Sequence, residues 1–83
     1  MARYEAHTKL PPKKAIEKAA EHFATLSGGL TVTSRTDDSL CLESPDGYVT
    51  ISICPNEKRG KMNVMQIETS QFDAQVRDFM KSL

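Results

Sequence analysis

The sequence predicts one α+β domain, in which a five-stranded antiparallel sheet carries two helices on one face. Five segments alternate apolar and polar side chains with a period of two, which is typical of half-buried strands. Two other segments repeat apolar side chains every three to four residues, as amphipathic helices do. The length of 83 residues suffices for one compact core. We therefore expect a single domain over residues 1–83.

The first strand is predicted over residues 3–10, where Arg3, Glu5, His7 and Lys9 alternate with Tyr4, Ala6, Thr8 and Leu10. Pro11-Pro12 ends this strand, and Pro12 suits the first turn of a helix because that position needs no backbone N–H. Apolar side chains then recur at helical spacing as far as Leu26, which predicts a helix up to Ser27. Gly28-Gly29 ends the helix, since glycine adopts the left-handed cap conformation without steric cost.

Three short strands are predicted next, and turn-forming sequences separate them. They lie within residues 30–35, 39–43 and 49–54. Apolar side chains on neighbouring strands must share a face, so the parity of the pattern predicts the register. Leu42 opposite Val49 meets this condition and leaves Ser44 to Gly47 as a four-residue loop. The same reasoning places Arg35 on the polar face of the sheet, opposite the helices.

The fifth predicted strand, residues 61–68, has an interrupted alternation. Met62 and Val64 share one phase of the pattern, whereas Met65 and Ile67 share the other. A bulge of one residue near Val64-Met65 would bring both pairs to the same face, and this is the expected arrangement. A strand that is buried on both faces is the alternative.

The last segment predicts a second helix that begins at Thr69-Ser70. Ser70 is the expected N-cap, with Asp73 three residues further on as in a capping box. The strongest apolar stripe of the chain follows at helical spacing. It consists of Phe72, Val76, Phe79, Met80 and Leu83.

The predicted order of elements is β-α-β-β-β-β-α, with the first strand beside the last. Both helices should cover the apolar face of the sheet, because each has one apolar stripe to bury. This order resembles the TATA-box-binding-protein-like and helix-grip group of folds. The resemblance covers the whole chain but concerns topology alone and rests on no sequence motif, so it implies no function.

The charge balance disfavours nucleic acid as a partner. Lys and Arg together number 11, Asp and Glu also number 11, and the net charge is zero. Nucleic-acid-binding domains usually carry a basic excess, because phosphate neutralisation dominates their affinity. The sequence also shows no apolar run that resembles a signal peptide or a membrane span. We therefore expect a cytoplasmic protein without membrane association.

Cys41 and Cys54 are expected to be free thiols on the polar face. In the predicted register Cys41 lies opposite Thr50, and Cys54 lies about 13 Å further along the strand. A disulfide requires Cα atoms within about 7 Å, so this pair should not form one. A zinc site needs two more ligands at a suitable spacing, which the sequence lacks. We therefore expect neither a metal nor another cofactor.

The two histidines do not predict an active site. His7 should lie on the polar face, and His22 on the outer side of the first helix. Neither has a carboxylate or thiol partner close in the predicted fold, and catalysis requires a second group that orients or activates the first. The adjacent carboxylates Asp37-Asp38 are typical of a turn. An enzyme is therefore the less favoured class, and we expect no catalytic residue.

The candidate binding residues fall into two groups. Lys58, Arg59 and Lys61 form the sharpest charge cluster of the chain, in a predicted loop that could contact phosphates or an acidic partner. Such charges also occur in solvated loops that discourage edge-to-edge aggregation, which is the plainer interpretation. His7 and Arg35 belong to the second group, on the polar face.

We hypothesise a small cytosolic interaction module, with a protein partner or a second copy of the chain as its ligand. A homodimer would form through the polar face or an edge strand. The first alternative is a small-ligand binder of helix-grip type. The second is a weak nucleic-acid binder that uses the loop from Lys58 to Lys61.

Overall fold

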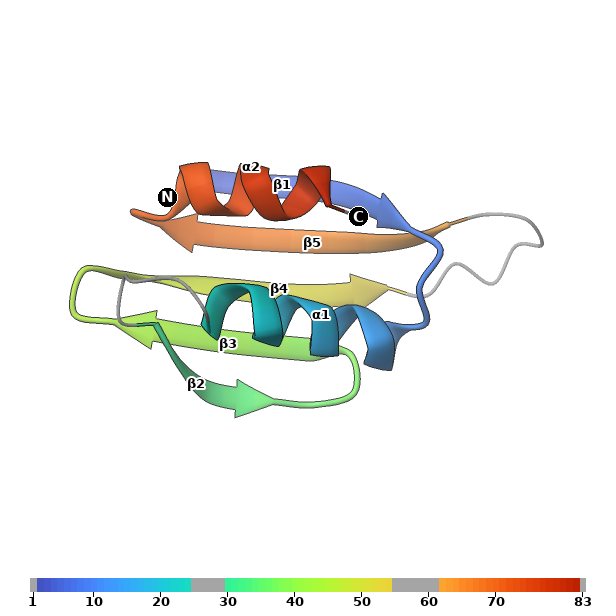
Figure 1. Ribbon diagram of the computed structural model, residues 1–83, viewed down its shortest axis with the longest axis horizontal. Helices are drawn as coiled ribbons and strands as arrows, with labels where there is room; N and C mark the ends of the chain where they lie inside the picture. Colours follow the sequence, from blue (N-terminus) through green and yellow to red (C-terminus); the bar gives the residue numbers. More distant parts are fainter. Residues whose placement is uncertain (1, 25–29, 55–61, 83) are drawn as a thin grey trace.

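The structure is a computed structural model that describes residues 2–24, 30–54 and 62–82. Its elements follow one another as β1 (Ala2–Thr8), α1 (Pro12–Ala24), β2 (Thr31–Arg35), β3 (Ser39–Ser44), β4 (Gly47–Cys54), β5 (Asn63–Ser70) and α2 (Asp73–Lys81). The strands form one antiparallel sheet in the order β1-β5-β4-β3-β2 (Figure 1). The predicted α+β class, with a five-stranded antiparallel sheet and two helices, is confirmed.

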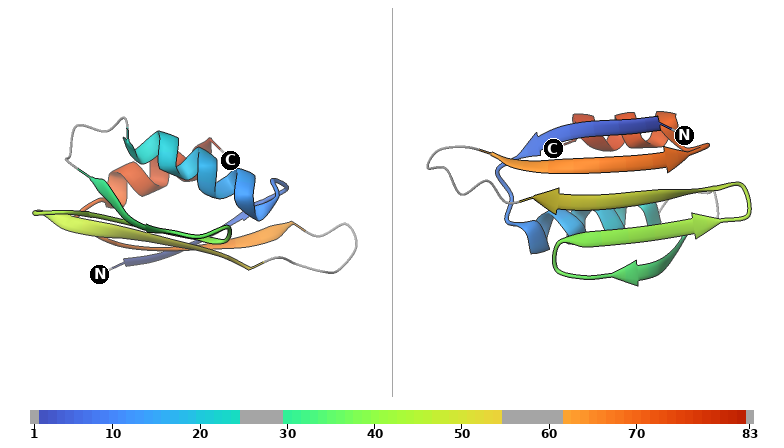
Figure 2. Two further views of the ribbon diagram at one scale, coloured as in Figure 1. Left: turned by 90° about the horizontal axis from the view of Figure 1, so that it is seen from below. Right: turned by 180° about the vertical axis from the view of Figure 1, so that it is seen from behind.

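Both helices lie on the same side of the sheet (Figure 2). Their buried side chains meet the apolar side chains of the sheet in a single core. Phe23 of α1 and Phe79 of α2 contact each other there, with ring centroids 5.5 Å apart. The sheet contributes Leu40, Leu42, Val49, Ile51, Ile53, Met65 and Ile67. The side of the sheet that carries no helix is called the polar face below.

The register between β3 and β4 agrees with the parity of the sequence. Leu42 pairs with Val49 as predicted, but the ladder continues until Ser44 pairs with Gly47, so the loop is shorter than expected. Glycine is needed at this position because a Cβ atom on Gly47 would overlap the carbonyl oxygen of Ser70 in β5. The turn between β3 and β4 therefore fits tightly against the end of β5.

The prediction of a bulge near Val64-Met65 is wrong, because β5 is regular there. β5 pairs with β1 and β4 without any shift in register, so Val64 lies half-buried on the polar face opposite His7. Asn63 consequently lies on the helix side. Its side-chain amide donates a hydrogen bond of 2.9 Å to the carbonyl oxygen of Leu10. This bond satisfies the polar group near the core, so no bulge is required to turn it outward.

The irregularity lies in β2 instead, where the register shifts between Val32 and Ser34. Val32 is opposite Leu42, and Arg35 is opposite Leu40, although Arg35 lies three positions after Val32 and a regular strand would turn it to the other face. Both side chains therefore share the helix side. The prediction that Arg35 lies on the polar face is wrong, because the shift turns this part of β2 over.

The second helix begins later than predicted, and Ser70 is not its N-cap. Ser70 is the last residue of β5 and pairs with Tyr48. Gln71 then turns the chain with a φ of 77°, and α2 begins at Asp73 after Phe72, which makes no side-chain capping bond. The pairing with β4 holds Ser70 in the sheet, which prevents it from capping the helix.

The first helix is described as far as Ala24. Its predicted end at Gly28-Gly29 lies outside the described residues. Within the described part of the chain, no helix has both the length and the apolar composition needed to cross a membrane.

The replacement Ile51→Asp should unfold the domain. Ile51 is 1% exposed and pairs with Leu40 and Ile67 in the middle of the sheet. An unpaired carboxylate there should cost more than about 4 kcal/mol, which approaches the whole stability of a domain of this size. Ser52→Asp is the matched control, because Ser52 is exposed on the other face. Thermal unfolding followed by circular dichroism measures both, and a cooperative transition of Ile51→Asp near that of the parent would contradict the assigned register.

Candidate functional site

The polar face carries an excess of negative charge. Alternation along the strands places three carboxylates there, from Glu5, Glu43 and Glu68, and one guanidinium, from Arg3. The remaining strand side chains on this face, which include the imidazole of His7, contain no carboxylate, ammonium or guanidinium group. The chain as a whole has zero net charge. The polar face is therefore locally acidic.

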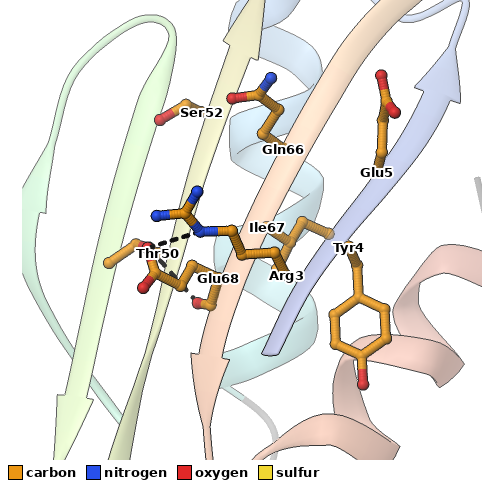
Figure 3. A pocket seen from close by; sticks show the side chains of 8 residues that line it. All are labelled: Arg3, Tyr4, Glu5, Thr50, Ser52, Gln66, Ile67 and Glu68. Carbon is orange, nitrogen blue, oxygen red and sulfur yellow. Dashed lines mark hydrogen bonds and ion pairs between the residues drawn. The ribbon is translucent and has the colours of Figure 1, made fainter. Parts of the chain in front are cut away.

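A shallow depression of about 480 Å³ crosses this face over β1, β5 and β4 (Figure 3). Its polar lining consists of Arg3, Glu5, Thr50, Ser52, Gln66 and Glu68. Tyr4 also borders it, but the ring points away toward α2, where the hydroxyl donates a hydrogen bond of 3.1 Å to Asp73 Oδ1. Charged, amide and hydroxyl groups thus surround one open hollow.

Glu68 lies at the centre of this lining because β5 is flanked by β1 and β4. Its Oε2 is 4.0 Å from Nε of Arg3, and its Oε1 accepts a hydrogen bond of 3.2 Å from the Tyr48 hydroxyl. Thr50 donates a bond of 3.4 Å to the backbone oxygen of Glu68. The Arg3 side chain is 84% exposed and that of Glu68 30%. The contacts with Arg3 and Tyr48 orient the carboxylate and leave it accessible.

Burial and the neighbouring carboxylate of Glu68 both act on the pKa of Tyr48. Desolvation of the ring, followed by the hydrogen bond to Glu68 and the negative charge of Glu68, raises the pKa of Tyr48 above its ordinary value of 10.0. The positive charge of Arg3 opposes this effect. Tyr48 therefore remains a protonated donor at neutral pH, and it fixes one oxygen of Glu68.

The two cysteines occupy the polar face at the positions predicted. Cys41 pairs with Thr50 and is half-buried, whereas Cys54 is exposed. Both thiols are free. Among the residues that the structure describes, no three or more His, Cys, Asp or Glu side chains are grouped so that they could hold a metal ion.

The histidines lie in different layers of the molecule. His7 is exposed on the polar face of β1, as predicted. His22 is not on an outer side of α1, because α2 lies beside it. Its half-buried ring contacts Phe23 and Phe79, with centroids 5.1 and 5.3 Å away. His22 thus belongs to the contact between the helices, and the predicted position is wrong.

Arg35 is separated from His7, the other predicted site residue that the structure describes, because β2 and β1 are the opposite edges of the sheet. It lines a second depression of about 280 Å³ on the helix side, together with Lys13, Ile16, Thr36 and Asp37. This depression is called the β2 groove below. The structure therefore brings Arg35 to the start of α1 and not to His7. Lys58, Arg59 and Lys61 lie outside the described residues, and their binding role stays a prediction.

The strand β2 forms an edge of the sheet that the helices leave uncovered. All five of its residues are exposed, and the apolar side chain of Val32 is 41% exposed. α1 lies over β3 and β4, and α2 lies over β5 and β1 (Figure 1). The β1 edge is thus shielded on the helix side, whereas the β2 edge is not.

The contact between Arg3 and Glu68 was missed by reasoning from the sequence, which assigned no pairing register to β1 and β5. The alternation along β5 could have revealed the position of Glu68. Ile67 points to the core, so the next residue, Glu68, must point to the polar face. Because Ile51 lies opposite Ile67, Glu68 lies opposite Thr50.

Comparisons with known proteins return nothing for this chain. No model of a protein family matches it, and no curated protein and no solved structure matches at a significant level.

Glu68→Gln should lower the pKa of the Tyr48 phenol. The carboxylate opposes ionisation of the phenol through its charge and its hydrogen bond, and the amide removes the charge. The pKa of Tyr48 in each variant is measured from the pH dependence of its ¹³Cζ resonance. Glu43→Gln is the control, since Glu43 pairs with Tyr48 but makes no contact that raises its pKa. An unchanged titration in Glu68→Gln would show that Glu68 does not face Tyr48.

Proposed function

We propose that this domain is a protein-interaction module that binds a basic polypeptide segment on its polar face. The observation that carries the proposal is the depression across β1, β5 and β4, whose lining contains two carboxylates and a single guanidinium. Complementary charge on a partner would steer its approach and fix its orientation on this surface.

The arrangement of Glu68 supports a basic ligand. Its carboxylate is oriented by Tyr48 and by Arg3, so little side-chain freedom is lost when a cation arrives. Glu5 is exposed on the neighbouring strand and adds a second negative charge to the same hollow. Basic side chains of one segment would meet these two charges at separate places in the hollow (Figure 3).

The neutral groups of the hollow suit a polypeptide. Gln66 and Ser52 pair across β5 and β4, and both are exposed. Amide and hydroxyl groups both donate and accept hydrogen bonds, as peptide groups do. An open hollow of this kind buries side chains of a partner, whereas pockets for small ligands enclose most of their ligand.

A homodimer formed by two polar faces is less favourable. Two copies would bring their carboxylates face to face, and like charges in an interface oppose association. The same charge disfavours nucleic acid on this face, because phosphates are also negative. The alternative of nucleic-acid binding through Lys58, Arg59 and Lys61 concerns a different part of the chain.

The packing argues against a small-ligand site between the sheet and the helices. Ile16, Phe23 and Phe79 on the helices are at most 1% exposed, as are Leu40 and Ile67 on the sheet. A void wide enough for a water molecule would expose the side chains that line it. The layer formed by these residues is therefore filled.

We further propose that the fold belongs to the TATA-box-binding-protein-like and helix-grip group of topologies. The order of the elements supports this, together with the position of β1 beside β5 at one edge of the antiparallel sheet. The proposal concerns topology and carries no ligand with it.

We also propose a cytoplasmic location. The two free thiols support it, because cysteines remain reduced in the cytosol and tend to form disulfides in oxidising compartments.

The binding proposal is tested by titrating the ¹⁵N-labelled domain with a peptide of alternating lysine and threonine. The amide resonances of Glu5, Gln66 and Glu68 should shift, and a peptide of alternating glutamate and threonine should leave them unchanged. Glu68→Gln should weaken binding by up to about fivefold, as expected for an accessible ion pair. Glu21→Gln is the control, because Glu21 is exposed on α1, away from this face.

Two results would overturn the proposal. The first is a pattern of shifts on the helix side of the molecule with the polar face unaffected. The second is equal binding of the acidic and the basic peptide, which would show that the charge of the polar face does not select its partner.

A further inference from the structure

The edge strand β2 differs from the other strands in its burial. β1, β3, β4 and β5 each bury side chains on the helix side, whereas all five residues of β2 are exposed. Neither α1 nor α2 lies over it in the part of the chain that the structure describes (Figure 1). Its outer edge therefore offers backbone N–H and C=O groups that an additional strand can pair with.

An apolar side chain marks the open side of this strand. Val32 lies on the helix side, opposite the fully buried Leu42, yet it remains 41% exposed. The pairing with β3 covers one flank of Val32 and leaves the other flank in water. An apolar side chain on an added strand would cover that second flank.

Positive charge lies beside Val32 on the same side. The register shift turns Arg35 to the helix side, where it lines the β2 groove with Lys13 and with Ile16 of α1. Asp37 supplies a carboxylate to this groove as well. Two cations and one anion thus line a partly apolar hollow. Their net positive charge complements an acidic side chain.

The spacing between Val32 and Arg35 determines the sequence pattern that a partner strand needs. Val32 and Arg35 lie opposite Leu42 and Leu40, which are two residues apart, so the two positions are about 7 Å apart along the edge. An added strand places every second side chain on the helix side. In antiparallel pairing, an acidic residue beside Arg35 precedes an apolar residue beside Val32 by two positions.

We propose that the β2 edge binds an extended segment of a partner protein with the pattern acidic-x-apolar, which adds to the sheet as an antiparallel sixth strand. Backbone hydrogen bonds to β2 supply affinity, and the contacts with Arg35 and Val32 select the sequence. This site is separate from the polar face, and it takes a partner of the opposite charge.

A second copy of the chain fits this edge less well. Antiparallel pairing of β2 with itself would bring Arg35 and Lys13 of both copies to the same side of the joint sheet, where like charges repel. In such a dimer, the register shift between Val32 and Ser34 of one copy would also lie against the same shift in the other copy. A short bulged edge of this kind is poorly suited to pairing with itself.

The test uses two capped peptides of identical composition, Thr-Glu-Thr-Val-Thr and Thr-Val-Thr-Glu-Thr. The ¹⁵N-labelled full chain is titrated with each at physiological ionic strength. The first peptide should shift the amide resonances of Thr31, Thr33 and Arg35 and slow their hydrogen exchange. The second should bind at least about fivefold more weakly, because antiparallel pairing would place its valine beside Arg35.

Variants of the chain separate the two contacts. Arg35→Glu should weaken binding of the first peptide about fivefold or more, and Val32→Ser should do the same by removing the apolar contact. Lys14→Ala is the control, since Lys14 is exposed on α1 next to Lys13 but does not line the groove. All these positions are exposed, except that Val32 retains one buried flank, so circular dichroism of each variant verifies its fold.

Absence of binding at millimolar peptide would overturn the inference, as would equal affinity for the two peptides or shifts confined to the polar face. Absence of binding or equal affinity would leave the basic ligand of the polar face unaffected, whereas shifts of the polar face with this acidic peptide would contradict that proposal as well. Conversely, a failure of the lysine-threonine peptide on the polar face would leave the β2 result unaffected.

Discussion

The pairing of β4 with both of its neighbours is the constraint on which the rest of the structure depends. β4 is the central strand, and its register sets Ile51 between Leu40 and Ile67 under the helices. A shift of one residue would turn that apolar row toward water and bring polar side chains into the core. Burial of apolar surface is the main favourable contribution to folding. The register of β4 therefore determines which side chains form the core and on which side of the sheet the helices pack.

The two candidate surfaces follow from the same constraint. Once Ile67 faces the core, Glu68 must face water, where the strands on either side supply Arg3 and Tyr48. Two helices of this length cover four strands and leave β2 bare, so Val32 keeps an exposed flank. The polar face and the β2 edge are therefore the surfaces that remain after the core has been closed, and they differ in the sign of their charge.

Local patterns in the sequence predicted the elements and the β3–β4 register, since a short hairpin ties its register to the parity of adjacent residues. They did not predict features that depend on distant pairing. The predicted bulge would have turned Asn63 toward water, but Leu10 lies close enough to accept its hydrogen bond. The bulge in β2 left no trace in the alternation, and it moved Arg35 away from the polar face. Ser70 has the chemistry of a helix cap, yet its pairing with Tyr48 retains it in the sheet. The Arg3–Glu68 contact joins residues at opposite ends of the chain, beyond the reach of any local pattern.

Native-state amide hydrogen exchange tests this account most directly, because it measures the free energy of opening at each strand separately. If the pairing of β4 organises the core and β2 is held by β3 alone, the amides of Ile51 and Ile67 should exchange only through global unfolding. The amides of β2 should then open at a free energy lower by at least about 2 kcal/mol. Equal protection of β2 and β4 would contradict the account, because it would mean that β2 unfolds together with the core and is not a separately exposed edge.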